Sequence, residues 1–301
     1  MHKSAATRGM TLLEIMIALL LLGVLSTFVV NVVDSVVGLW QQGERRGRGD
    51  LVYASVAERL QSDLRALHLG DRGWMIIDDY VARPAADGVA EWRLPRLRFL
   101  ATGGGLSADD PLGTHAVEIM WMLVPERALG PRFAKLVRVA QIEGLAASLQ
   151  ENGAALSVAG NNNAITIVDG ILNLSFITSG TRNNLVSAAY SGLNFPTMIE
   201  LEVERVAGNA RKKPPRLDAG VDGENASVVL RGIAPLKMPP LALINDEWVA
   251  VGGNFPRISF SARAKRDTIA VSHDSGSYMY FPTLYASRHP LLNSGRRAVD
   301  A

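Results

Sequence analysis

The chain has 301 residues, of which 48% are hydrophobic and 20% charged, and 31 lysines and arginines nearly balance 29 acids. This composition excludes an intrinsically disordered chain, and the net charge of +2 argues against a protein that binds nucleic acid by bulk charge. The absence of cysteine excludes disulfides, thiolate metal sites and cysteine nucleophiles. The five histidines are not spaced as metal ligands, so no cofactor is predicted.

The N-terminus carries the strongest signal in the sequence. Residues 1–9 form a short polar leader that has Lys3 and Arg8 but no acid. Residues 10–33 are an apolar run in which Glu14 is the only charge. A helix of this length spans roughly 36 Å at ~1.5 Å per residue, which is enough to cross a bilayer. The basic leader predicts a cytoplasmic N-terminus and a head on the far side of the inner membrane, although the arginines at 45–48 oppose this orientation.

Glu14 is the residue that a simple membrane signal does not explain. A cleaved secretory signal has a shorter apolar region and a small-residue cleavage site close behind it, and neither is present here. A plain signal anchor fits the length of the run but leaves the acid without a role. Because a carboxylate deep in an apolar segment is costly, Glu14 points to a function.

The residues Arg8-Gly9-Met10-Thr11-Leu12-Leu13-Glu14, followed by a long apolar helix, resemble the class III signal of type IV pilins and type II secretion pseudopilins. The resemblance implies that prepilin peptidase cleaves between Gly9 and Met10 and that Met10 is then N-methylated; the family usually has Phe at this position. It also implies that Glu14, the fifth residue of the mature chain, pairs with the new terminal amine of a neighbouring subunit. Such a pair would be desolvated, so it would favour one register of assembly.

Residues 34–69 are predicted to continue the helix. Three glycines lower the helix propensity of residues 43–49, which predicts a flexible joint there and an N-cap at Asp50. The segment that follows has an apolar face and a polar face at helical spacing. The apolar positions are Tyr53, Val56, Ala57, Leu60, Leu64 and Leu67, and the expected solvated positions are Glu58, Arg59, Gln61, Asp63 and Arg65.

Beyond residue 70 the hydrophobic period changes to two, which is typical of strands. Residues 116–124 and 135–142 are predicted to form a hairpin, and residues 165–168 and 171–178 a second hairpin around Asp169-Gly170. Residues 197–206 alternate between apolar residues and glutamates, as in an antiparallel strand with one covered face. Further strands are expected at 97–101, 257–263 and 278–285.

The sequence therefore predicts an α+β fold in which a long N-terminal α-helical spine, transmembrane in its first half, packs on an antiparallel β-sheet head domain. Over residues 8–206 the order of elements resembles the J-class minor pseudopilins and the large minor pilins, which implies a pilin-like head. The expected segments are a leader at 1–9, a transmembrane helix at 10–33, its continuation at 34–69, the head at 70–206, an insertion or C-terminal β extension at 207–293, and a tail at 294–301.

Three other patterns were weighed as sites. The run from His273 to Ser277 has the residue types of a hydrolase, but the chain has no G-x-S-x-G motif, so catalysis is not predicted. Asp218, Asp222 and Glu224 lie in a glycine-containing loop that does not match the EF-hand spacing; a solvated loop is favoured and calcium binding stays open. The basic run 211–216 is predicted to be a solvated loop.

The function expected from the resemblance is that of a non-enzymatic minor pilin or pseudopilin subunit, at the tip or in the priming of a short filament that supports protein secretion. Its implied partners are prepilin peptidase, other minor and major subunits, inner-membrane lipid and secreted cargo. Two alternatives stay open: a minor pilin for adhesion or DNA uptake, and a periplasmic binding module or enzyme on a signal anchor.

Overall fold

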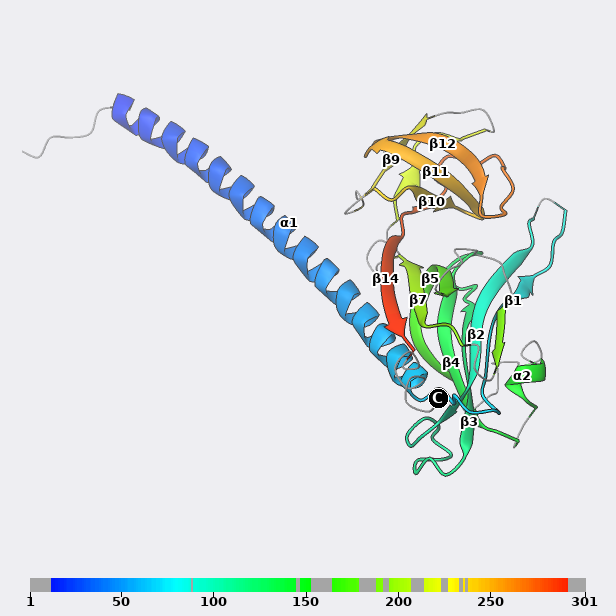
Figure 1. The fold of residues 1–301 in the computed structure, drawn as a ribbon. Helices are drawn as coiled ribbons and strands as arrows, with labels where there is room; N and C mark the ends of the chain where they lie inside the picture. The colour runs from blue at the N-terminus through cyan, green and yellow to red at the C-terminus, as the bar shows by residue number, and fades with distance from the viewer. Residues whose placement is uncertain are drawn as a thin grey trace, which may run out of the picture. The chain divides into compact units, whose positions relative to one another are not determined.

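The computed structural model describes residues 12–87, 89–144, 147–152, 164–178, 188–191, 195–206, 214–222, 227–232, 235 and 238–291. The chain divides into two compact units, Met1–Asp50 and Leu51–Ala301. The described residues form two α-helices and two β-sheets, and all the strand pairs between them are antiparallel (Figure 1). The coarse prediction of an N-terminal apolar helix followed by an antiparallel β-sheet domain is thus confirmed.

Helix α1 runs from Leu12 to Arg65 without a break. The N-cap predicted at Asp50 is therefore wrong, because Asp50 lies inside the helix, and residues 43–49 are helical as well. Each glycine costs roughly 1 kcal/mol relative to alanine, but extending a helix that is already formed is far easier than starting a second one. The flexibility of this segment stays a prediction.

The last part of α1 helps to build the core of the second unit. Val56, Leu60 and Leu64 are buried against the first sheet, as their spacing predicted. Beyond Arg65 the chain joins this sheet directly, since the backbone N–H of His68 donates to the carbonyl oxygen of Leu100 at 2.9 Å. The prediction that Asp63 faces solvent is wrong: its side chain is fully buried.

The first sheet has eight strands in the order β14-β7-β5-β4-β3-β2-β1-β6 and is strongly curved, almost like part of a barrel (Figure 1). The predicted hairpin of β3 and β4 is confirmed, and β7 shows the predicted alternation of buried apolar residues with glutamates. The strands are β1 (Trp74–Arg83), β2 (Trp92–Thr102), β3 (Ala116–Pro125), β4 (Ala134–Ile142), β5 (Ala164–Thr178), β6 (Ala188–Ser191), β7 (Met198–Arg205) and β14 (Thr283–Pro290).

The second predicted hairpin is wrong, because β5 is one strand of 15 residues that continues through Asp169-Gly170 without reversing direction. Its first half pairs with β4 and its second half with β7, and the register shifts near this dipeptide in both pairings. Gly170 has a φ of 69°, and a residue with positive φ suits a β-bulge as well as a tight turn. Asp-Gly therefore bends a strand here instead of reversing the chain.

Residues 207–293 both form a second sheet and extend the first one. The six strands of the second sheet have the order β13-β10-β11-β12-β9-β8, while β14 returns to pair with β7 at the edge of the first sheet (Figure 1). The strands of the second sheet are β8 (Arg216–Leu217), β9 (Ser227–Arg231), β10 (Leu241–Ile244), β11 (Glu247–Asn254), β12 (Arg257–Lys265) and β13 (Met279–Tyr280).

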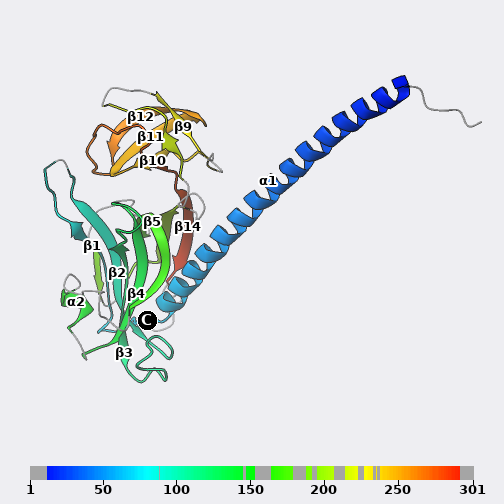
Figure 2. The ribbon, with the colours of Figure 1, turned by 180° about the vertical axis from the view of Figure 1, so that it is seen from behind.

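Both faces of the first sheet are covered in its centre. The concave face packs against the C-terminal part of α1, and Trp121 of β3 lies on this side. The short helix α2 (Leu149–Asn152) covers the opposite face, where Met120 and Met122 are buried beneath Leu149 (Figure 2). Met120, Trp121 and Met122 are therefore all buried, although they alternate between the two faces of β3.

Candidate functional site

The apolar segment of α1 is the first candidate site. Among the described residues it is the one helix long and apolar enough to cross a membrane: 23 residues, Ile15–Val37, with a mean hydropathy of 2.5 and no part of this stretch buried. The hydroxyl of Thr27 donates to the Gly23 carbonyl oxygen at 2.9 Å, and that of Ser35 to the Asn31 carbonyl oxygen at 2.8 Å. These two hydroxyls are therefore satisfied inside the helix, as a hydrocarbon environment requires.

The three residues predicted to carry processing and assembly are only partly described. Gly9 and Met10 lie outside the described residues, so cleavage and N-methylation at this position stay predictions. Glu14 lies in the first turn of α1, but nothing is described of its side chain. The predicted pair between Glu14 and a neighbour's terminal amine also stays a prediction.

A buried ion pair fastens the last turns of α1 to the first sheet. Arg138 of β4 donates to both carboxylate oxygens of Asp63, from Nε to Oδ2 at 2.6 Å and from Nη2 to Oδ1 at 2.9 Å. The indole Nε1 of Trp121 donates to Oδ2 of Asp63 at 2.8 Å, and Arg138 Nη2 also donates to the Leu106 carbonyl oxygen at 2.8 Å. Asp63 is thus bonded at both oxygens, which makes up for part of the cost of burying its charge.

Tyr53, in the first helical turn of the second unit, provides another attachment of α1. Its hydroxyl donates to the carbonyl oxygen of Leu201 on β7 at 3.3 Å, and its ring stacks on Tyr285 of β14 with the ring centres 5.0 Å apart. Burial raises the pKa of Tyr53, although a hydrogen bond with Ser287 acts in the opposite direction. The C-terminal strand β14 is therefore held both by β7 and by the helix.

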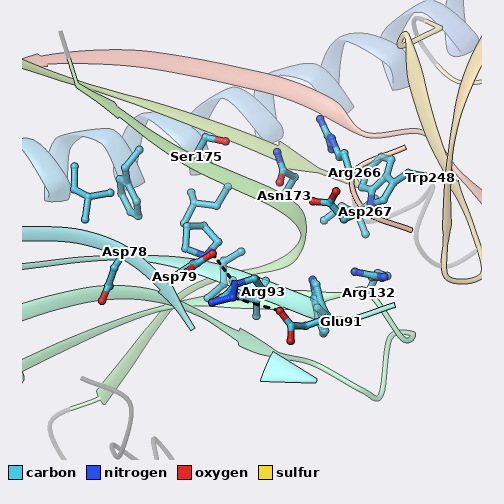
Figure 3. A pocket seen from close by; sticks show the side chains of 18 residues that line it. Asp78, Asp79, Glu91, Arg93, Arg132, Asn173, Ser175, Trp248, Arg266 and Asp267 are labelled. Atoms are coloured by element: carbon cyan, nitrogen blue, oxygen red, sulfur yellow. Dashed lines mark hydrogen bonds and ion pairs between the residues drawn. The ribbon is translucent and has the colours of Figure 1, made fainter. Parts of the chain in front are cut away.

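A cavity with a volume of about 470 Å³ lies in the second unit. Figure 3 shows Asn173 and Ser175 of β5 on one side of it and Asp79 of β1 with Arg93 of β2 on the other. Arg93 donates to Asp79 at 3.0 Å and to Glu91 at 3.3 Å. The rest of the lining is mostly apolar, from Ile77, Trp92, Leu94, Pro95, Leu123, Leu172, Leu174, Phe176 and Trp248, with further charged groups at Asp78, Arg132, Arg266 and Asp267.

One end of this cavity is built by a charge cluster that joins the two sheets. Asp246, in the turn between β10 and β11, accepts from Arg83 Nη2 at 2.6 Å and from Arg132 Nε at 2.5 Å. Both guanidinium groups also lie over the ring of Trp92, at 5.9 and 5.8 Å from its centre. Burial lowers the pKa of Arg132, and the charge of Asp246 opposes this shift. Sequence reasoning missed this cluster, because its members lie far apart in the chain.

A second buried cluster lies within the second sheet, around Glu247. Its carboxylate accepts from Arg263 Nε at 2.9 Å and lies 2.9 Å from His273 Nε2. Burial by itself would raise the pKa of Glu247, but hydrogen bonds with His273, Arg263 and two backbone N–H groups outweigh it and hold the pKa at about 2. Ser275 donates to the carbonyl oxygen of Asp218 at 2.9 Å, so the hydrolase-like run 273–277 is engaged in structural contacts.

The acidic loop and the basic run do not come together as a site among the residues described. Asp218 forms an ion pair with Arg231, and Glu224 lies outside the described residues. Arg216 donates to the hydroxyl of Tyr278 at 2.8 Å and stacks on its ring, while 211–213 lie outside the described residues. In the described part of the chain, no group of three or more histidine and acidic side chains could hold a metal ion.

Comparisons with known proteins assign no family to this chain. No protein-family model matches it, and no match was found among curated proteins or among solved structures.

Proposed function

We propose that this chain is a minor pilin-like or pseudopilin-like subunit. It is inserted in the inner membrane with its head in the periplasm, cut by prepilin peptidase between Gly9 and Met10, and assembled through α1 into a short filament or its tip. The observation that carries the proposal is the position of Glu14 at the start of α1. It is the only charged residue in the apolar run 10–33, and it lies five residues after Gly9, which ends a basic leader.

In this proposal the new amine of Met10 in one subunit neutralises Glu14 of its neighbour. A lone carboxylate in hydrocarbon is costly, so an unpaired Glu14 disfavours every register except the one that brings an amine to it. The exposed apolar side chains of Ile15–Val37 then pack against those of neighbouring subunits and against lipid. The chain performs no catalysis; it supplies a position in the filament and a head for other minor subunits or cargo.

The continuity of α1 supports the proposal. One helix contains both the apolar segment and the residues that enter the core of the head, including Leu60 and Asp63. The buried pair of Asp63 and Arg138 fastens the end of this helix to the sheet. The head therefore stays attached to the segment through which a pilin-like subunit would be assembled.

The first experiment is expression of the full chain with and without a prepilin peptidase, followed by intact mass measurement. The expected product is a chain that has lost residues 1–9 and gained one methyl group, and the Gly9→Val variant is expected to keep its leader. A leader that stays attached in the presence of an active peptidase would refute the proposal.

The second experiment separates the role of Glu14 from a general effect of charge in the helix. Glu14→Ala is expected to be cleaved normally but to lose co-assembly with other subunits. Asp34→Asn is the matched control, because Asp34 is the one charged residue within Ile15–Val37. Equal co-assembly of both variants with the unchanged chain would show that the Glu14 pair is not needed.

The head cavity favours a second candidate function, that of a periplasmic binding module on a membrane anchor. A cavity of about 470 Å³ with an apolar wall and charged groups at one end is a typical small-molecule site. The two functions differ in the fate of the leader: a simple anchored module keeps residues 1–9, and a pilin-like subunit loses them.

A further inference from the structure

Arg132 is the feature of the head cavity that its structural contacts do not explain. It lies in the loop between β3 and β4, lines the cavity, and is only 3% exposed. Its Nε is used by Asp246, but its Nη2 is buried and has no hydrogen-bond partner among the described residues. A buried donor on a charged group is costly to leave unpaired, so an acceptor that a ligand brings to this nitrogen would be bound strongly.

The hydrogen bonds around Arg132 leave two guanidinium nitrogens of the cluster without an acceptor among the described residues. Arg83 and Arg132 share the single carboxylate of Asp246, and the Nε of Arg83 is likewise buried without a partner. Arg266 and Arg93, which also line the cavity, are each bonded to acids of their own, Arg266 to Glu204 through both terminal nitrogens. Asp267 is the carboxylate in the lining whose charge acts on Arg132, and it would compete with a bound anion.

The apolar part of the lining determines the rest of the ligand. Leu94, Leu123 and Phe176 present apolar surface to the cavity, and Trp92 and Trp248 add two aromatic rings near its charged end. Figure 3 shows Trp248, Arg266 and Asp267 together at one end and Ser175 further along the cavity. A ligand that fits this distribution has an apolar or aromatic body and one anionic group at its end.

We propose that the cavity binds a small amphipathic organic acid, with its carboxylate on Nη2 of Arg132 and its apolar body against Leu94 and Phe176. Guanidinium and carboxylate groups match in charge and geometry, and their hydrogen bond strengthens in a site from which water is excluded. The proposal does not depend on pilin-like assembly, because every residue in it belongs to the second unit.

The test uses the full chain in lipid nanodiscs and equilibrium dialysis of two probes, 2-naphthoate and its neutral isostere 2-naphthamide. Empty nanodiscs of the same composition measure the partition of each probe into lipid. The expected result is saturable binding of one naphthoate per chain, at least about tenfold tighter than that of the amide. Absence of saturable binding, or equal affinity for the two probes, would overturn the proposal.

Two arginine variants test the assignment to Arg132. Arg132→Gln is expected to weaken naphthoate binding at least about tenfold. Arg72→Gln is the control, since it removes a guanidinium that is paired with Glu143 at 2.8 Å and does not line the cavity. It is expected to change the affinity by no more than about threefold. Equal losses in the two variants would refute the assignment.

Two further variants test the proposal independently if Arg132→Gln fails to fold. Asp267→Asn removes the competing carboxylate and is expected to tighten naphthoate binding while leaving that of naphthamide unchanged. Leu174→Trp enlarges a buried side chain of the cavity lining and is expected to abolish binding of both probes. Naphthoate binding that survives Leu174→Trp would place the site elsewhere and overturn the proposal.

Discussion

Replacing Asp63 by asparagine is expected to destabilise the head by about 3 kcal/mol. The variant keeps the size of the side chain but leaves the guanidinium of Arg138, which is 2% exposed, without a counter-charge. Removing one partner of a buried ion pair typically costs about 3–5 kcal/mol. Because asparagine can still accept one hydrogen bond, from Trp121 or from Arg138, we expect the lower end of this range.

The assay is urea unfolding of the full chain in detergent, followed by tryptophan fluorescence. With a denaturant dependence of about 2 kcal/mol per molar urea, the expected loss moves the unfolding midpoint by about 1.5 M. Arg59→Gln is the matched control, because Arg59 also faces Asp63, at 3.9 Å, but its side chain is 43% exposed. Such an exposed pair contributes less than about 1 kcal/mol.

A double variant tests the physical reason for the loss. Asp63→Leu combined with Arg138→Met removes both charges and fills the site with apolar side chains, so it is expected to be more stable than Asp63→Asn alone. If Asp63→Asn unfolds at the same urea concentration as Arg59→Gln, the pair does not fasten α1 to the sheet. If the double variant is the least stable of the set, the buried charge itself is not the source of the cost.

Three other predictions follow from the head. The pKa of Glu247 lies at about 2 instead of its ordinary 4.5, so its contribution to stability is complete above pH 4.5 and is lost as the pH falls towards 2; Glu247→Gln should flatten this part of a plot of melting temperature against pH. Gly170→Ala should destabilise the head by about 1 kcal/mol in urea unfolding, because alanine disfavours a φ of 69°. Burial raises the pKa of Tyr80 to about 12, so Tyr80→Phe should remove one tyrosine from the part of an alkaline absorbance titration near pH 12.

Hydrophobic period predicted well those elements whose two faces differ. The helix face of Val56, Leu60 and Leu64 and the alternating strand β7 were identified because one face of each contacts the core and the other contacts water or polar neighbours. Strand β1 was missed, since its sequence WMIIDDYVAR changes from an apolar run to an acidic pair without alternating. In the structure, these acids are paired with arginines of β2: Asp78 with Arg96 at 2.6 Å, and Asp79 with Arg93.

The buried acids could not be predicted from periodicity, because their burial depends on partners that are distant in sequence. Asp63 lies one residue before Leu64 of the core face, and the charge of Arg138, 75 residues away, compensates its burial. The partners of the partly buried Asp246 are likewise distant in sequence, in β1 and in the loop between β3 and β4. A pattern of polar residues on a strand or helix predicts solvent exposure only where no oppositely charged side chain lies across the core from it.

The buried and partly buried ion pairs of this head join separate elements, and they therefore help to fix how those elements are oriented. Asp63 joins α1 to β4. Asp246 joins the β10–β11 turn to β1 and to the loop before β4. Glu204 of β7 pairs with Arg266, the residue that follows β12. Apolar contacts such as that of Phe133 with Trp248 hold the two sheets together, but they do not select one orientation as charged hydrogen bonds with fixed geometry do.

In the first two of these junctions, at Asp63 and at Asp246, the carboxylate accepts hydrogen bonds from more than one side chain. At Asp63, Nη2 of Arg138 donates both to the carboxylate and to the Leu106 carbonyl oxygen. At Asp246, by contrast, Nη2 of Arg132 has no hydrogen-bond partner among the described residues, and Arg132 lines a cavity. The junction between the sheets is therefore also the place where the proposed ligand would bring its carboxylate.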